Sequence, residues 1–568
     1  MRNPVIIVNS EKNNKKSPVA AAVWWIIYFI ILAVAYWFVL PPLNWRSGEM
    51  WGFVIFALVL RFIISAFSSL KKLFDIKPGG ISVSKERASD AFKGFGKLSK
   101  FTLAAVAVVF AFMLVSSAVG LEIFNAPAYA NLLQSTDGAF ASDVAELSMS
   151  SIPVVDRDTA KRLGLRKLGE MSDLVSQFEV DEKYYTQINL NGSPYRVTPL
   201  KYGDFFKWMN NQSEGVPAYV TVNMVTQETK LVRLENGIKY SDSEYFMRNL
   251  YRHLRFKYPT KIFDNISFEL DDDGTPYWIA SVVGYRIGVW NGRDIDGAVM
   301  CNAVTGECVY YDIDDIPTWV DQVYDASLLI EQLVYNGKYQ SGFFNSIFGQ
   351  KGVMTPTDGY NYLAINDDVY LYTGITSVAS DESNVGFVLI NLRTKETKYY
   401  VCPGAEEYSA MESAEGVVQD LGYNSTFPIL LNVDDRPTYF VSLKDSAGLV
   451  KMYAFIDVQQ YQVVATGATI KEARENYTAK LSSETDSFRG EMPEPEPEPQ
   501  TASGIIAQIS SAVIDSKTNY YIMLESDNNI YIVGVDKNDK LPFAKAGDSV
   551  TVTYTEKNGR ITVTDIEF

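Results

Sequence analysis

Cysteine and histidine are scarce in this chain of 568 residues, which has three cysteines and one histidine. Zinc sites and Cys/His catalytic pairs draw on these two residue types, and so small a supply leaves little material for either. We therefore expect no metal site, no cofactor and no identifiable catalytic residue. The chain is not predicted to be an enzyme.

Positive charge is also in short supply over most of the chain. The formal net charge is −17, yet residues 1–120 contain fourteen Lys/Arg against five Asp/Glu, so the remainder carries −26. Nucleic-acid binding requires a basic face, and this balance excludes a nucleic-acid partner. Disorder is not expected either, because 47% hydrophobic and 13% aromatic residues supply material for several packed domains.

Long apolar runs occur only near the N-terminus. Residues 20–40 and 101–120 contain no charge, and residues 51–70 contain a single one, Arg61. Each run is long enough to cross a bilayer as a helix. Residues 20–120 are therefore predicted to form an α-helical membrane anchor with three transmembrane helices.

Basic residues indicate the orientation of this anchor. The connection 71–100 holds eight basic and three acidic residues, and residues 1–19 hold four basic ones. The positive-inside rule places the N-terminus and this loop in the cytoplasm. The chain is thus predicted to be a multi-pass protein of the cell membrane, in contact with the lipid bilayer, with everything after residue 120 extracytoplasmic.

Two features of the anchor leave alternatives open. The segment NAPAYA ends at Ala130 in the small-x-small form of a signal-peptidase site, so cleavage after Ala130 remains an alternative to an intact anchor. Arg61 lies deep within the second run. It is either a snorkelling or hydroxyl-bonded arginine or a contact with a partner membrane protein.

A short pattern recurs four times in the extracytoplasmic part. Alternating β-branched and aromatic residues flank a polar turn, which is typical of two antiparallel strands joined by a tight loop. The pattern predicts a repeated hairpin module rather than an active site. Its copies are VNMVTQETKLV from Val222, CNAVTGECVYY from Cys301, INLRTKETKYY from Ile390 and the weaker IDVQQYQVVAT from Ile456.

Aromatic strands and helices are predicted between these hairpins. Strand signals recur as SPYRVTP, TPYWIAS, DVYLYTG and PTYFVSL. Ser241 and Glu244 have capping-box spacing at the start of a predicted helix over 241–257. Further helices are predicted over 316–335, 405–421 and 469–481. Residues 121–185 are interpreted as a helical juxtamembrane segment, and residues 186–482 as an α+β repeat ectodomain with antiparallel sheets.

The composition changes near residue 490. Residues 483–502 include MPEPEPEPQ, an acidic and proline-rich stretch typical of an extended linker. Residues 503–568 then show five short alternating strands and an Asn558-Gly559 turn. This pattern predicts a small all-β barrel of the OB or SH3-like kind.

Cys301 and Cys308 flank the second hairpin at positions that face each other across its strands. In an oxidising compartment such a pair can form a disulfide, and two free buried thiols are the alternative. Cys402 is then left as a small buried apolar residue. His253 is interpreted as a structural histidine.

Acidic and tyrosine-rich segments have a plain interpretation and a functional one. The acidic runs at 271–273 and 312–315 lack the spacing of a calcium loop and are interpreted as solvated turns. No spacing marks a carboxylate pair for glycoside hydrolysis. The 35 tyrosines serve sheet packing, or in part a recognition surface.

The second hairpin and the strand before it resemble the PepSY-type repeat, whose usual form is a DG-x-x-YW strand and a closing D-x-x-TGE hairpin. The matching residues are Asp273, Gly274, Tyr277, Trp278, Thr305, Gly306 and Glu307. Asn302 stands where an acidic residue is common, and the other copies have Gln227 or Lys395 in place of the glycine. The resemblance covers parts of residues 190–480. It implies an extracytoplasmic, often membrane-anchored protein of a kind proposed to restrain or regulate envelope peptidases, and it supplies no catalytic residue.

Two hypotheses follow from these observations. The first is a non-enzymatic cell-envelope protein of a Gram-positive-type bacterium, whose extracytoplasmic repeats bind or regulate protein or cell-wall partners. The second is an envelope hydrolase that acts on glycans or peptides through unidentified carboxylates. A deep pocket with two inward carboxylates would favour the second hypothesis.

Overall fold

The computed structural model describes residues 18–70, 75–77, 80–82, 97–146, 151–378, 380–489, 500–514, 517–527, 529–557 and 560–568. Residues 1–17, most of the basic loop, residues 490–499 of the Pro/Glu linker and the Asn558-Gly559 turn lie outside the described residues. The chain forms two compact units, Met1–Thr478 and Ala479–Phe568. Each unit is described by itself.

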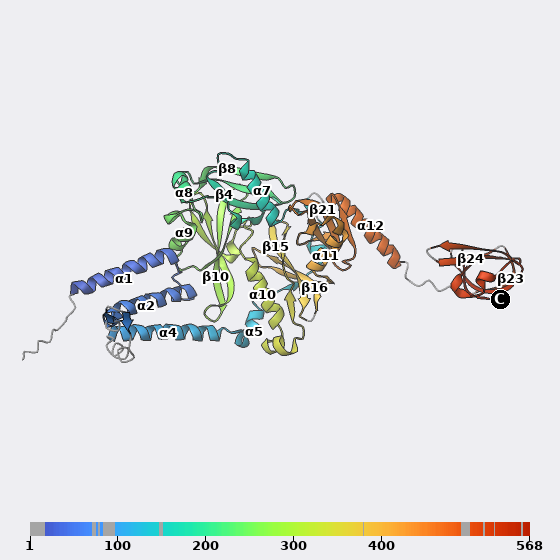
Figure 1. Ribbon diagram of the computed structural model, residues 1–568. Coiled ribbons are helices and arrows are strands. Elements are labelled where there is room, and N and C mark those ends of the chain that lie inside the picture. Colours follow the sequence, from blue (N-terminus) through green and yellow to red (C-terminus); the bar gives the residue numbers. More distant parts are fainter. Residues whose placement is uncertain are drawn as a thin grey trace, which may run out of the picture. The chain divides into compact units, whose positions relative to one another are not determined.

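Three long helices open the first unit: α1 (Pro18–Val39), α2 (Gly48–Leu70) and α4 (Lys97–Val119) (Figure 1). Among the described residues, two segments are long and apolar enough to cross a bilayer, Ala22–Val39 and Lys100–Val119. The predicted middle span does form a helix, α2, which packs against α4 but is not one of these two segments. The prediction of three transmembrane helices is therefore supported for two of them.

Four mostly antiparallel sheets follow, and each is built on a meander of four consecutive strands preceded by a helix. We call these units repeat 1 (157–238), repeat 2 (250–312), repeat 3 (326–405) and repeat 4 (407–467). The helices are α7 (Arg157–Gly169), α9 (Leu250–Lys257), α10 (Ala326–Tyr339) and α11 (Glu407–Val417). The predicted α+β repeats with antiparallel sheets are confirmed at this level.

The strands of repeats 1 and 2 run in chain order across their sheets. Repeat 1 contains β5 (Thr186–Leu190), β6 (Ser193–Tyr202), β7 (Val216–Asn223) and β8 (Thr229–Ile238), with β4 (Phe178–Val180) and helix α8 (Phe205–Asn211) added. Repeat 2 contains β9 (Phe263–Leu270), β10 (Pro276–Ile287), β11 (Asn291–Asn302) and β12 (Cys308–Asp312).

Repeats 3 and 4 have the same plan with short additional strands at the edges. Repeat 3 contains β14 (Asn361–Ile365), β15 (Asp368–Ser377), β16 (Ser380–Asn391) and β17 (Thr397–Ala405), flanked by β13 (Met354–Pro356) and by β3 (Thr136–Asp137). Repeat 4 contains β19 (Ile429–Val433), β20 (Arg436–Lys444), β21 (Val450–Asp457) and β22 (Val464–Gly467), with β18 (Asn424–Ser425) at one edge.

The four predicted hairpins share one set of hydrogen bonds. In the first three, the side-chain oxygen of an asparagine accepts the backbone N–H groups two and three residues later, at 2.8–3.0 Å. Asp457 does the same in the fourth, with Gln459 and Gln460. This local capping of the turn explains why the motif recurs in the sequence. The asparagines are Asn223, Asn302 and Asn391.

The residue after each Asn or Asp closes its repeat. Its N–H donates to the carbonyl at the start of the aromatic strand, and its own carbonyl accepts from the segment that enters the helix of that repeat. We call these four buried positions the closure residues: Met224, Ala303, Leu392 and Val458. Hydrogen bonding within the repeat thus joins its first and last parts.

Hydrophobic cores lie between neighbouring repeats as well as within them. One cluster joins Ile279 of β10 with Leu329 of α10 and Leu371 of β15, and another joins Phe387 of repeat 3 with Tyr439 of repeat 4. Consecutive repeats therefore bury part of each other's apolar surface, as expected for a stacked repeat protein.

The predicted helix over 241–257 is shorter than expected. Helix α9 starts at Leu250, because Asn249 caps it by accepting the N–H of Arg252. Glu244 is not a capping residue; it is buried and accepts hydrogen bonds from Tyr202 Oη and Trp208 Nε1 at 2.8 and 2.7 Å. Glu244 thus bonds to Tyr202 and Trp208, which are distant in the sequence, and not to the nearby backbone N–H group of a capping box.

The juxtamembrane segment 121–185 is helical only in part. It contains α5 (Glu122–Ala130), α6 (Phe140–Asp143) and α7, together with strands β3 and β4. Ala130 is 7% exposed in a cluster with Tyr129 and Tyr339, and Tyr129 Oη donates to the Gly120 carbonyl. A peptidase would have to unfold α5 to cleave after Ala130.

The second unit contains a closed five-stranded barrel, which confirms the predicted small all-β fold. Its strands are β23 (Gln500–Ile514), β24 (Lys517–Leu524), β25 (Ile530–Gly534), β26 (Ser549–Lys557) and β27 (Arg560–Glu567). Ile506, Tyr531 and Val552 are among the fully buried residues of its core. Helix α12 (Ile470–Arg489) crosses the boundary between the units.

Candidate functional site

The Cys301/Cys308 pair lies where the sequence places it. The two residues are directly opposed in the β11–β12 register, and their Sγ atoms are 2.6 Å apart. Both are free thiols in the structure, so the disulfide stays a prediction. Cys402 is buried in the core between repeats 3 and 4, as expected.

His253 joins this hairpin, which sequence reasoning did not anticipate. Its Nε2 lies 2.7 Å from the Gly306 carbonyl, and Lys257 Nζ donates to the same oxygen at 3.0 Å. Gly306 has φ +73°, and a Cβ there would overlap the Tyr240 ring. Glycine is needed in this copy for that reason, whereas Gln227 and Lys395 adopt a positive φ, of 63° and 65°, at the same position with a side chain present.

The ligand atoms of His253, Cys301 and Cys308 all lie within 4.8 Å of one another. The contact with Cys301 lowers the pKa of the Cys308 thiol to about 6, while contact with Cys308 and burial raise that of Cys301. Two thiolates on one tetrahedral zinc ion would stand about 3.8 Å apart, given Zn–S bonds of about 2.3 Å. The closer sulfur atoms fit an oxidisable pair better than a metal site.

Arg61 stacks on an aromatic ring within the anchor. Its Cζ lies 4.0 Å from the centroid of the Trp25 ring of α1. Its Nε is buried and has no hydrogen-bond partner among the described residues. A cation–π contact therefore accounts for part of its placement, which neither sequence alternative included.

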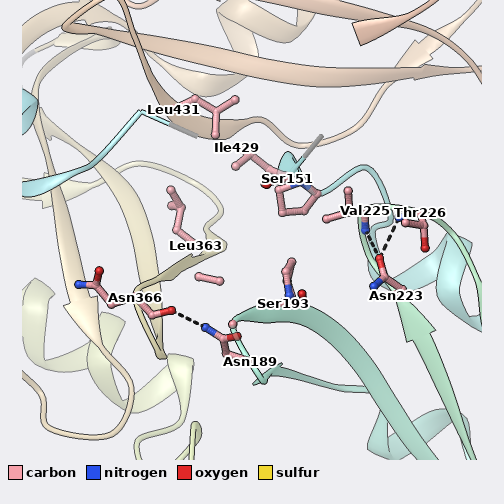
Figure 2. A pocket seen from close by; sticks show the side chains of 14 residues that line it. Ser151, Asn189, Ser193, Asn223, Val225, Thr226, Leu363, Asn366, Ile429 and Leu431 are labelled. Atoms are coloured by element: carbon pink, nitrogen blue, oxygen red, sulfur yellow. Dashed lines mark hydrogen bonds between the residues drawn. The ribbon is translucent and has the colours of Figure 1, made fainter. Parts of the chain in front are cut away.

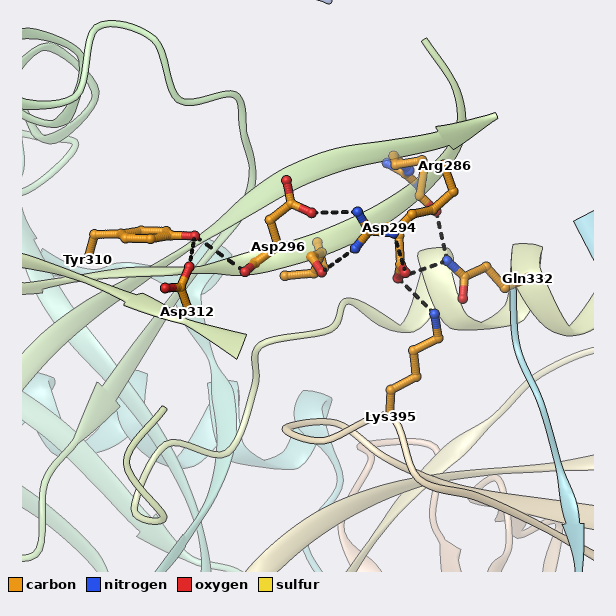
Figure 3. Close-up of polar contacts among 9 residues, drawn as sticks. Arg286, Asp294, Asp296, Tyr310, Asp312, Gln332 and Lys395 are labelled. Carbon is orange, nitrogen blue, oxygen red and sulfur yellow. Dashed lines mark hydrogen bonds and ion pairs between the residues drawn. The ribbon is translucent and has the colours of Figure 1, made fainter. Parts of the chain in front are cut away.

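The acidic runs form turns and cross-links, in line with their interpretation as turns. Asp271 Oδ1 accepts the N–H groups of Asp273 and Thr275, which fixes a tight turn. Figure 3 shows an acidic group outside these two runs, in which the Asp294 carboxylate binds Arg286 and Lys395. The Lys395 Nζ to Asp294 Oδ1 distance is 2.7 Å, so this ion pair ties the third hairpin to repeat 2.

A polar cavity of about 420 Å³ lies among the repeats. A volume of this size suits a small molecule or a short peptide segment. Residues from all four repeats and from the segments between them contribute to its wall. They are Asp156, Arg157, Asp158, Lys183, Tyr184, Tyr185, Thr186, Gln187, Arg196, Asn265, Ile266, Ser267, Gln322, Asp325, Tyr360, Asn361, Tyr362 and Phe427.

The carboxylates of this cavity already have structural partners. Asp156 caps α7 through the N–H of Thr159 and pairs with Lys444 Nζ at 2.7 Å. Asp325 caps α10 by accepting the N–H of Ser327. Asp158 pairs with Lys161 at 3.7 Å. Each of the three therefore has at least one partner within the protein.

The basic side chain on the floor of the cavity is less well satisfied. Arg196 is 6% exposed, donates to Gln187 Oε1 at 3.2 Å and forms no ion pair with a described carboxylate. Burial lowers its pKa to about 10. No local pattern marks this residue, since it lies in SPYRVTP among strand-forming residues.

A smaller cavity of about 230 Å³ lies beside the first hairpin. Figure 2 shows Asn189 reaching toward Asn366, whose carbonyl accepts from Asn189 Nδ2 at 2.8 Å. Asn223 and its capped turn lie at the opposite side. The bond from Asn189 to Asn366 links repeats 1 and 3 at this cavity.

Two buried carboxyl groups lie at the junction of the first three repeats. Glu269 is fully buried and accepts hydrogen bonds from the backbone N–H groups of Asp321 and Gln322 at 2.8 and 3.1 Å. Asp321 accepts the N–H of Asn189 at 2.6 Å. Burial raises the pKa of Glu269 to about 7, and burial and the nearby Glu269 raise that of Asp321.

No family model matches the chain. A comparison with curated proteins also found no match.

Proposed function

We propose that this protein is a membrane-anchored component of a Gram-positive-type cell envelope, whose extracytoplasmic repeats bind a partner without transforming it. The anchor would have three spans, with the N-terminus and the 71–100 loop in the cytoplasm. Two apolar helices and the charge of the connecting loop support this topology.

Contacts between the helices and repeat 2 support a rigid connection at the outer surface. Arg46, in the loop between α1 and α2, donates to the carbonyls of Gly288 and Val289, both at 2.9 Å. Arg255 of α9 donates to the Leu40 carbonyl at 2.9 Å. These bonds hold repeat 2 against the ends of the helices.

An exposed apolar surface continues from this contact. Arg252 of α9 lies over the Trp37 ring and also donates to the carbonyl of Phe246. Phe246, Met247 and Phe206 of α8 are half-exposed or more, at 61%, 50% and 69%. Such a surface, next to the end of a membrane helix, favours insertion of this side of the repeats into the bilayer interface.

The polar cavity between the repeats carries the functional part of the proposal. It offers polar and aromatic groups for recognition, while its three carboxylates are held by helix caps and ion pairs. General acid–base hydrolysis requires a carboxylate free to exchange protons with substrate. Binding therefore explains the cavity better than hydrolysis.

The partner would be a protein or a cell-wall component. The likeness of repeat 2 to PepSY-type repeats favours an envelope peptidase that the protein restrains. The C-terminal barrel would add a second contact. Its meander of three strands, with β27 parallel to β25 and β26 closing against β23, favours the OB type over the SH3 type.

Site-specific photo-crosslinking in intact cells tests this function. A photoreactive residue in place of Tyr360, which lines the cavity and is 43% exposed, should capture a discrete partner of unaltered mass. Tyr461 is 42% exposed but does not line the cavity, and the same replacement there is the matched control. Equal capture from both positions would contradict the proposal, and recovery of a cleaved partner would favour the hydrolase.

Protease accessibility tests the topology. Protease added to intact cells or protoplasts should digest the chain beyond residue 120 and spare the 71–100 loop. Protection of the repeats would overturn the orientation.

A further inference from the structure

The four repeats provide an internal comparison that isolates one pair of residues. In each repeat, the N–H of the closure residue donates to the carbonyl of the first or second residue of the aromatic strand, at Pro194, Pro276, Val369 and Pro437. Because this bond is present in all four repeats, it identifies equivalent positions without reference to sequence similarity. The position two residues after the acceptor of this bond is Arg196 in repeat 1. In the other repeats it is Trp278, Leu371 and Tyr439.

The same position is a core position in three repeats. Trp278, Leu371 and Tyr439 are at most 1% exposed. Their cross-strand neighbours are Phe268, Tyr362 and Leu430. In repeat 1 the directly opposed pair is instead Gln187 and Arg196. The fold thus accepts a hydrophobic pair at this place, and packing does not require the arginine.

This polar pair is buried with few internal partners. Gln187 and Arg196 are 1% and 6% exposed, and one hydrogen bond of 3.2 Å joins them. The Nε of Arg196 and the Nε2 of Gln187 are buried without a hydrogen-bond partner among the described residues. An unpaired buried cation is strongly unfavourable, so a structure retains one where something outside the chain compensates it.

Both side chains line the 420 Å³ cavity. Arg157 also lines it, and its guanidinium donates to backbone carbonyls of the 182–184 turn rather than to a carboxylate. The nearby Asp156 is compensated by Lys444. Arg157 and Arg196 thus give this lining positive charge that no described carboxylate pairs with, while the carboxylate of Asp325 is held as the cap of α10. Tyr360 and Phe427 add aromatic rings to the lining.

We propose that Arg196 and Gln187 bind an anionic oxygen group, a carboxylate or a phosphate, of the ligand that enters this cavity. The planar guanidinium donates two parallel N–H bonds to such a group, and the Gln187 amide supplies a third donor. The aromatic rings pack on the remainder of the ligand. The inference rests on the proposed binding function and adds the chemical class of what is bound.

Thermal unfolding of the purified full-length protein tests the site. Tryptophan fluorescence follows only the first unit, because the chain has no tryptophan after Trp319. Sodium phosphate or sodium acetate should raise the melting temperature more than sodium chloride at equal ionic strength. The anion with the larger effect identifies phosphate or carboxylate as the preferred group.

The double variant Gln187→Leu with Arg196→Tyr installs the pair found in repeat 4. It should fold with an unchanged or higher melting temperature in chloride. It should lose the additional rise in melting temperature caused by phosphate or acetate, with at least tenfold weaker apparent affinity for that anion. Arg233→Met removes an exposed arginine, paired with Asp173, that does not line the cavity, and should keep the shift. A shift that survives in the double variant, or that is absent from the parent protein, overturns the anion site.

Crosslinking from position 360 in the double variant separates this inference from the proposed function. Partner capture by the parent protein together with no anion shift would overturn the anion site and leave the binding function standing. Reduced capture by the double variant would support both. Absence of capture by the parent protein would overturn the binding function alone.

Discussion

Glu269 and Asp321 make the stability of the repeats depend on pH in an unusual direction. Most carboxylates are stabilised in their charged form by folding, whereas burial raises the pKa of Glu269 to about 7 and that of Asp321 as well. Their contribution to stability is fully present below the unfolded value of about 4.3 for Glu and is lost as the pH rises through 7.

We therefore expect the melting temperature of the first unit to be higher at pH 5 than at pH 8. For Glu269 alone, the free-energy difference between the two conditions is on the order of 3 kcal/mol. Glu269→Gln should flatten this dependence, because the amide does not titrate. Glu307→Gln, at an exposed position, is the control and should preserve it. An unchanged profile in Glu269→Gln would rule out this carboxyl as its source.

A second residue-scale prediction concerns Cys301 and Cys308. Outside the cell we expect them to form a disulfide, so mass spectrometry under non-reducing conditions should find the two peptides joined. Because the closed loop is very short, replacing both cysteines by serine should cost only about 1–2 kcal/mol of unfolding free energy. Two alkylatable thiols in freshly isolated protein would contradict the prediction.

The sequence could locate these cysteines but not their surroundings. Spacing around a turn is a local property, and it predicted correctly that Cys301 and Cys308 face each other. His253 and Gly306 are brought together by packing of α9 on the hairpin, over 53 positions of sequence. No local pattern records such a contact. The same holds for Arg196, whose importance emerges only when the repeats are compared in register.

At the scale of elements, the hairpin motif has a testable energetic meaning. Asn302→Ala removes two hydrogen bonds that cap the second turn, from Val304 and Thr305 at 3.0 and 2.9 Å. By analogy with helix caps, we expect a loss of about 1 kcal/mol of unfolding free energy. Asn302→Asp should be almost neutral, because Asp457 performs this capping in repeat 4. Equal losses of unfolding free energy in the two variants would show that the turn does not depend on the side-chain oxygen at position 302.

Helices were less predictable than hairpins. The segment 316–335 has helical character in the sequence, yet α10 begins only at Ala326. The preceding residues form turns and bends, in which Val323 and Tyr324 donate their N–H groups to the Leu392 carbonyl. Closure of the repeat therefore overrides local propensity and shifts the start of the helix to Asp325, its cap.

At the scale of the whole molecule, the barrel is expected to be an independent domain. Its strands close on themselves and its core is drawn from its own residues. Expressed alone, residues 500–568 should show dispersed amide resonances and a cooperative thermal transition. Deleting them should leave the melting of the repeats, followed by tryptophan fluorescence, unchanged. An unfolded fragment, or destabilised repeats, would make the barrel a structural part of the ectodomain.

The closure residues bear on how such a chain is made. In the proposed topology, translocation would deliver the repeats one after another, beginning at the membrane. Each closure bond joins two points of a single repeat. A repeat can therefore close once it has emerged, and its bonds to later segments, such as those of Asn189 with Asp321 and Asn366, form afterwards. A chain that gains or loses one whole repeat would still end in a completed turn.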